Sequence, residues 1–166
     1  MLDREAFFGG TWAAAASWFG AHPAEKGYRF RLWAPHARDV RLAGDFSGWE
    51  PVAMQCADGV WECTVETAKV YDSYKFCLTQ ADGKTVWKTD PYAFHTSTRP
   101  QTDSKLAPLD YAWQDSAWQQ SLAEKPLLQR PLNIYEVHLG SWRRYGDGSP
   151  FDYRKLADEL AEYVSD

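Results

Sequence analysis

The chain has 166 residues, of which 45% are hydrophobic and 25% are charged, and its formal net charge is −5. This size and composition are typical of one globular domain, or of one domain with part of another. The net charge is negative and the sequence contains no run of Lys and Arg that would form a basic patch, so we expect neither a nucleic acid nor a membrane as partner.

Cysteine and histidine usage indicates neither a disulfide framework nor a metal centre. Cys56, Cys63 and Cys77 are odd in number and lack CxxC spacing, which favours reduced thiols. The four histidines are scattered along the chain, so we predict no metal site and no cofactor. The apolar stretch TWAAAASWFG is too short to span a bilayer and lacks the basic flank of a signal peptide, so a cytoplasmic location is expected.

The predicted strands begin at residue 28, after a lead segment at 1–27. In YRFRLWAP, the apolar residues at positions 28, 30 and 32 alternate with Arg29 and Arg31, which is the pattern of a half-buried strand.

Further short strands are predicted in DVRLAGDF, VWECTVE, SYKFCLTQ and KTVWKTD. Turn signals separate them, and Asp82 with Gly83 predicts a tight hairpin. Asp90, Pro91 and Tyr92 predict a proline-led turn at the end of the last strand. Because no helical period interrupts these runs, the sequence predicts a mainly β protein with an antiparallel sandwich over residues 28–109.

The alternating strand pattern ends at Leu109. Residues 110–131 mix polar residues with tryptophans and close on prolines, which indicates a linker with room for one short helix. The next residues are apolar nearly throughout, as in a strand covered on both faces: Ile134, Tyr135, Val137 and Leu139.

A helix is predicted to follow this strand. Ser149 is the expected N-cap, with Pro150 at the first helical position. Apolar residues then recur at helical spacing and form one stripe: Tyr153, Leu156, Leu160 and Tyr163 or Val164. One strand and one helix cannot bury their apolar surfaces alone, so residues 132–166 are predicted to open a larger α/β domain.

The segment IYEVHLGSWRR closely resembles the first barrel strand of the glycogen branching enzymes of glycoside hydrolase family 13. YRFRLWAPHARDVRLAGDFSGWE, SYKFCLTQADGK and KTDPYAFHTSTRP are similar to the family 48 carbohydrate-binding module that precedes that barrel. The resemblance implies an immunoglobulin-like antiparallel β-sandwich followed by the first β-strand and α-helix of a (β/α)8 barrel. It also implies two partners, an α-glucan such as glycogen or amylose-like chains and the remainder of the chain's own barrel.

For the parent enzyme, the resemblance implies a retaining transfer that converts α-1,4 links into α-1,6 branches, with an Asp nucleophile and a Glu acid/base. Asp147, Asp152 and Asp158 do not match those motifs. We therefore assign no catalytic residue here and expect the 166-residue chain to be inactive alone. A fragment of a debranching enzyme or of a trehalohydrolase, and a stand-alone glycogen-binding module, are the alternatives.

Three residues match positions that bind oligosaccharide in some modules of this family: Trp49, Lys75 and Trp87. The C–H face of a sugar stacks on an indole, while its hydroxyls bond to a polar side chain. The alternative is that the tryptophans pack internally and Lys75 is a solvated strand residue.

At the predicted barrel mouth, Trp142 and Arg143 are candidates for contact with a donor glucan chain. The alternative, packing of Trp142 against the preceding module, is preferred. Glu136 and His138 alternate to one side of the predicted strand and invite an acid/base pairing. A packing role is again preferred for both.

Overall fold

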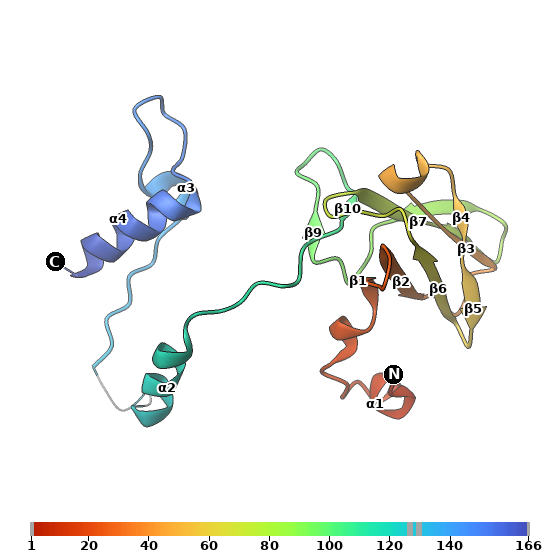
Figure 1. The fold of residues 1–166 in the computed structure, drawn as a ribbon, viewed down its shortest axis with the longest axis horizontal. Helices are drawn as coiled ribbons and strands as arrows, with labels where there is room; N and C mark the ends of the chain where they lie inside the picture. The colour runs from red at the N-terminus through yellow and green to blue at the C-terminus, as the bar shows by residue number, and fades with distance from the viewer. Residues whose placement is uncertain (1, 126–127, 129–130, 166) are drawn as a thin grey trace. The chain divides into compact units, whose positions relative to one another are not determined.

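The computed structural model describes residues 2–125, 128 and 131–165. It divides into two compact units, Met1–Tyr111 and Ala112–Asp166, whose elements are labelled in Figure 1.

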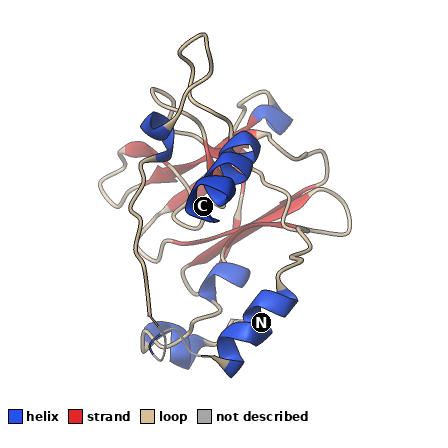
Figure 2. Ribbon diagram, turned by 90° about the vertical axis from the view of Figure 1, so that its left-hand side faces the viewer, coloured by secondary structure: helices blue, strands red, loops and turns tan. Residues whose placement is uncertain are grey.

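The first unit contains two antiparallel sheets, drawn in red in Figure 2. The four-stranded sheet has the order β1 (Gly20–Pro23), β2 (Tyr28–Trp33), β6 (Val60–Val65) and β5 (Gln55–Ala57). The six-stranded sheet has the order β4 (Val52–Ala53), β3 (Asp39–Gly44), β7 (Ser73–Thr79), β10 (Ser104–Lys105) and β9 (His95–Thr96), and β8 (Thr85–Lys88) also pairs with β7. The predicted antiparallel, sandwich-like arrangement is confirmed.

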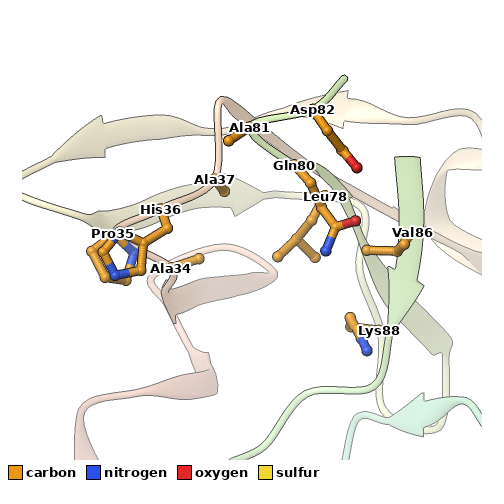
Figure 3. Close-up of a pocket in the computed structure, with 10 residues that line it drawn as sticks. All are labelled: Ala34, Pro35, His36, Ala37, Leu78, Gln80, Ala81, Asp82, Val86 and Lys88. Carbon is orange, nitrogen blue, oxygen red and sulfur yellow. The ribbon is translucent and has the colours of Figure 1, made fainter. Parts of the chain in front are cut away.

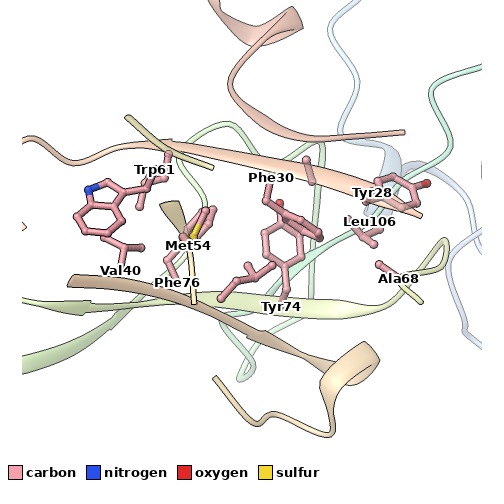
Figure 4. Close-up of a cluster of buried hydrophobic side chains, with 12 residues drawn as sticks. Tyr28, Phe30, Val40, Met54, Trp61, Ala68, Tyr74, Phe76 and Leu106 are labelled. Carbon is pink, nitrogen blue, oxygen red and sulfur yellow. The ribbon is translucent and has the colours of Figure 1, made fainter. Parts of the chain in front are cut away.

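The core lies between the two sheets and follows the predicted alternation (Figure 4). All three apolar positions predicted to face inward on β2 are buried, whereas Arg29 and Arg31 are not. Phe30 of β2 contacts Tyr74 of β7, with ring centroids 5.1 Å apart, so side chains from the two sheets meet directly. Aromatic pairs of this kind stabilise a core beyond the apolar area that they bury.

The lead segment is partly built into the sandwich. It contains α1 (Arg4–Phe8), the 3-10 turn η1 (Ala15–Ser17) and strand β1, which pairs with β2 over its whole length. Phe7 contacts Trp33 of β2 at 5.3 Å, and Phe19 stacks on Tyr92 at 5.2 Å. The first sheet therefore begins at Gly20 and not at Tyr28. Four residues ending in proline show no alternation of their own, so their strand state depends on pairing with β2.

The hairpin predicted at Asp82 and Gly83 is confirmed. Gly83 has φ +84°, and the N–H of Gln80 donates to the Lys84 carbonyl at 2.9 Å. The Asp82 carboxylate accepts the N–H of Lys84 at 2.9 Å, which closes the turn between β7 and β8.

The second unit is helical, with α2 (Ser116–Glu124), α3 (Leu139–Trp142) and α4 (Tyr153–Ser165). Helix α2 occupies the predicted linker. Residues 131–138 join no strand in the described part of the chain, and α3 begins at Leu139, where the sequence predicts a strand. A strand needs a neighbour for its backbone hydrogen bonds, and the described residues supply none here. The barrel start at 132–166 stays a prediction.

Helix α4 begins later than predicted. The Asp152 carboxylate accepts the N–H groups of Arg154 at 2.9 Å and Lys155 at 3.0 Å, so Asp152 and not Ser149 is the N-cap. Ser149 is held in the preceding loop, where its N–H donates to Asp147 at 2.9 Å. The prediction failed because two competing cap residues stand three positions apart in the sequence.

On the predicted stripe of α4, Leu156 is 3% exposed and Leu160 is half-buried. Tyr153, Tyr163 and Val164 are exposed within the second unit. Across the described ranges, none of the helices is both long and apolar enough for a membrane span.

Candidate functional site

Lys75 and Trp87 lie on the outer face of the six-stranded sheet. On β7, Phe76 points into the core, so its neighbours Lys75 and Cys77 point outward. Cys77 is the register partner of Trp87 on β8, which places the Trp87 indole on the same outer face. Trp87 is 47% exposed and presents much of its ring to solvent.

Lys75 is anchored and is not a freely solvated side chain. Its Nζ donates to Thr102 Oγ1 at 2.8 Å and lies 3.2 Å from Asp103 Oδ1, both from the loop between β9 and β10. An ammonium has three N–H donors, and these contacts use two of them. The geometry therefore holds the amine in place and leaves it a donor for a ligand hydroxyl.

Trp49 follows the 3-10 turn η2 (Asp45–Ser47) in an unusual backbone conformation, with φ +67°. A non-glycine residue in this region is strained and needs support from its surroundings. The Trp49 N–H donates to the Gly44 carbonyl at 2.9 Å, and its indole N–H donates to Asp45 Oδ1 at 3.0 Å. Asp45 Oδ2 also accepts the Ser73 N–H at 2.7 Å. The turn thus fixes a 37% exposed indole against the start of β7.

All three predicted glucan-binding residues are held by the neighbouring strands β3, β7 and β8. Ala43 of β3 pairs with Lys75, and the next residue, Gly44, carries the backbone bond to Trp49. Trp87 of β8 pairs in register with Cys77, which lies two residues after Lys75 on β7. Two exposed indoles and an anchored ammonium have the composition of a sugar-binding surface.

A buried polar network lies on the opposite side of β7. Asp90 is 4% exposed, and its carboxylate accepts the Tyr74 hydroxyl at 2.7 Å and the Tyr92 N–H at 2.8 Å. The Asp90 N–H donates to Ser104 Oγ at 2.9 Å. The sequence predicted a turn here but not its burial, because Tyr74 and Ser104 are distant in the chain. The network ties the segment after β8 to β7 and β10.

Burial raises the pKa of Asp90 above its ordinary 3.8, although the hydrogen bonds from Tyr74 and Tyr92 oppose that change. The folded state therefore binds this proton more tightly than the unfolded state. The stability contributed by the protonated carboxyl is complete below about pH 3.8 and is lost as the pH rises through the folded-state value.

We expect Asp90→Asn, which is neutral at every pH, to remove this dependence. The free energy of unfolding of the wild type minus that of Asp90→Asn should be largest below about pH 3.8 and should fall toward neutral pH. Urea denaturation across that range measures it. A difference that grows with pH would contradict the assigned direction.

A hollow of about 520 Å³ lies between the loop after β2 and the β7–β8 hairpin (Figure 3). Leu78 and Val86 are among its apolar residues, and His36 and Lys88 are among its polar residues. Its described lining includes no Trp, Tyr or Phe. It therefore lacks the flat stacking ring that a sugar site uses, and we do not place the glucan site there.

Trp142 and Arg143 are engaged in packing inside the second unit. The Trp142 indole donates to the Tyr135 hydroxyl at 3.0 Å. The Arg143 guanidinium lies 4.6 Å from the Trp142 ring centroid and bonds to Glu159 of α4 at 2.5 Å. His138 Nδ1 lies 2.8 Å from Ser141 Oγ, a partner on α3 and not Glu136. These partners all belong to the second unit, and the predicted packing of Trp142 against the preceding module stays a prediction.

Comparison with known families agrees with this architecture. Residues 18–93 match the family Carbohydrate-binding module 48 (Isoamylase N-terminal domain). The matched range begins just before β1, the first strand of the four-stranded sheet.

Curated relatives match over much more of the chain. It is 40% identical to the 1,4-alpha-glucan branching enzyme GlgB of Halothermothrix orenii, over 99% of this chain and 28% of the relative. It is 41% identical to the GlgB of Bacillus caldolyticus, over 88% of this chain and 23% of the relative. The chain thus spans less than a third of the length of these relatives.

Among solved structures, a PulA mutant of Klebsiella pneumoniae in complex with maltotriose is similar to this chain. The TM-score is 0.50 at 25% identity, over 60% of this chain and 12% of that one. The sequence matches show that the chain is homologous to the N-terminal part of 1,4-alpha-glucan branching enzymes, and that its residues 18–93 match carbohydrate-binding module 48.

Proposed function

We propose that this chain is the glucan-binding N-terminal part of a longer branching enzyme. The observation that carries the binding role is the pair of exposed indoles with an anchored Lys75: Trp87 lies on β8 next to the β7 strand that carries Lys75, and Trp49 is held by the turn that follows β3. The rings would stack on the apolar faces of glucose units, and the amine would donate to a hydroxyl. The ligand is a neutral α-glucan chain such as glycogen or amylose.

Affinity electrophoresis in gels that contain glycogen tests this role. The double variant Trp49→Ala, Trp87→Ala should bind about 100-fold more weakly, because each lost ring removes about 1.5 kcal/mol of stacking and apolar burial. Trp118→Ala, which removes an exposed indole of α2, is the matched control and should migrate like the wild type. Unchanged retardation of the double variant would remove the proposal.

The bond rearrangement is proposed for the parent protein and not for this chain. The longer protein would transfer α-1,4-glucan segments to 6-hydroxyls through a covalent intermediate on carboxylates outside these 166 residues. Amylose treated with the full protein should lose iodine absorbance without release of reducing sugar. Release of reducing sugar would indicate hydrolysis instead, as in the debranching alternative.

A further inference from the structure

A groove of about 650 Å³ lies in the first unit, on the outer face of the four-stranded sheet. Strands β2, β6 and β5 form its floor, and Trp18 and Arg4 of the lead segment line its side. It belongs to the sheet opposite the one that carries Lys75 and Trp87.

Three polar side chains cross the floor in one row. Arg31 of β2 pairs in register with Glu62 of β6, and Glu62 pairs with Gln55 of β5. Register partners in antiparallel strands project to the same face, so all three side chains rise into the groove. Two strand spacings separate the ends of the row, about 10 Å.

Trp18 holds the Arg31 end of this row in place. The Arg31 guanidinium lies 4.4 Å from the Trp18 ring centroid, donates to the Trp18 carbonyl at 3.2 Å and bonds to Glu62. The Arg31 side chain is 14% exposed, whereas that of Glu62 is 43% exposed. The groove thus combines a rigid aromatic wall with a carboxylate that still reaches solvent.

The charges of the groove cancel in pairs. Arg31 is paired with Glu62, and Arg4 is paired with Asp58. An anionic ligand would have to compete with those carboxylates, whereas a neutral polyhydroxyl ligand would not. Gln55 is exposed and offers both a donor and an acceptor, which suits hydroxyl groups.

We infer that this groove is a second saccharide site, which takes a neutral segment of α-glucan. The choice of ligand rests on the proposed function, whereas the site is independent of the Trp49 and Trp87 surface. A chain with sites on both sheets would hold two glucan segments at once. The linked sites would raise the avidity for a branched polymer.

Indole N–H resonances separate the two sites, because Trp18 reports on the groove and Trp49 and Trp87 report on the other sheet. We would record nitrogen–proton correlation spectra of the 166-residue chain during titration with maltoheptaose. Each indole signal is assigned by its loss in a single Trp→Phe variant. The Trp18 signal should shift and saturate, and Gln55→Ala should weaken that titration about fivefold.

Gln80→Ala removes an exposed glutamine from the β7–β8 hairpin and is the matched control, with no expected effect on Trp18. Glu62→Gln is the second variant, and it should also weaken the Trp18 titration. Inorganic phosphate should leave the Trp18 signal in place, since the groove has no uncompensated positive charge.

The outcomes are distinguishable. If the Trp49 and Trp87 indole signals shift and the Trp18 signal does not, the groove is not a saccharide site, and the proposed function is still supported. A shift of Trp18 alone supports the groove and overturns the proposed face. A Trp18 shift that Gln55→Ala leaves unchanged, or a shift driven by phosphate alone, also overturns the groove. A spectrum in which no indole responds overturns both.

Discussion

Replacing Asp90 with alanine is expected to lower the free energy of unfolding by about 3 kcal/mol at neutral pH. The substitution leaves the Tyr74 hydroxyl, on a residue that is 1% exposed, and the Tyr92 N–H without their acceptor. Each orphaned donor costs about 1–3 kcal/mol, and the lost side chain adds a small cavity. At neutral pH the substitution also removes the cost of burying the Asp90 carboxyl, whose pKa is raised by burial. The net loss of stability is therefore smaller than the summed costs of the two orphaned donors and the cavity.

Urea denaturation followed by near-ultraviolet circular dichroism measures this effect. Glu66→Ala removes an exposed carboxylate next to β6 and should stay within about 0.5 kcal/mol of the wild type. Tyr74→Phe removes the donor instead, and its double-mutant cycle with Asp90→Ala gives the coupling energy directly. A coupling near zero would mean that the hydroxyl and the carboxylate do not stabilise one another.

Gly27→Ala should be more damaging, with a loss above about 3 kcal/mol or no folded first unit. Gly27 lies in the turn between β1 and β2 at φ +63°, where an L-residue pays about 1–2 kcal/mol. An added Cβ would also overlap the Val65 carbonyl oxygen and lie 2.7 Å from the Glu66 Cα. Both obstacles are backbone atoms of a chain segment paired with β2, so they cannot rotate away.

Gly83→Ala separates the conformational cost of a positive φ from the cost of the steric overlap in Gly27→Ala. Gly83 has φ +84°, but an added Cβ there meets nothing within 4 Å. It should cost about 1–2 kcal/mol, the conformational part alone. The excess loss in Gly27→Ala over Gly83→Ala is then the steric part, read from the difference in urea midpoints. Equal losses would show that the β1–β2 turn can shift away from β6.

The family match and the sandwich core were both accessible from the sequence. Positions 28, 30 and 32 alternate with arginines because a strand between core and solvent repeats every two residues, and the structure buries all three. The site residues were proposed by resemblance alone. Their binding role stays a prediction, although the structure shows how Lys75 and Trp49 are anchored.

The sequence did not predict features that depend on residues distant in the chain. The four residues of β1 have no alternation, and β2 makes them a strand. Asp90 looked like a turn residue, and its burial becomes evident only when Tyr74 and Ser104 surround it. At the start of α4, Ser149 and Asp152 had equivalent local signals, and the hydrogen bonds of the preceding loop decided between them.

The sequence by itself determined which residues of the strands face the core, where the β7–β8 hairpin turns and which family the chain resembles. These are local properties, because pleat periodicity and turn chemistry act over a few neighbouring residues. Only the tertiary structure decided the row of Arg31, Glu62 and Gln55 and the burial of Asp90. Strand register, which brings together residues separated by tens of positions, is a property of the folded sheet and not of any one segment.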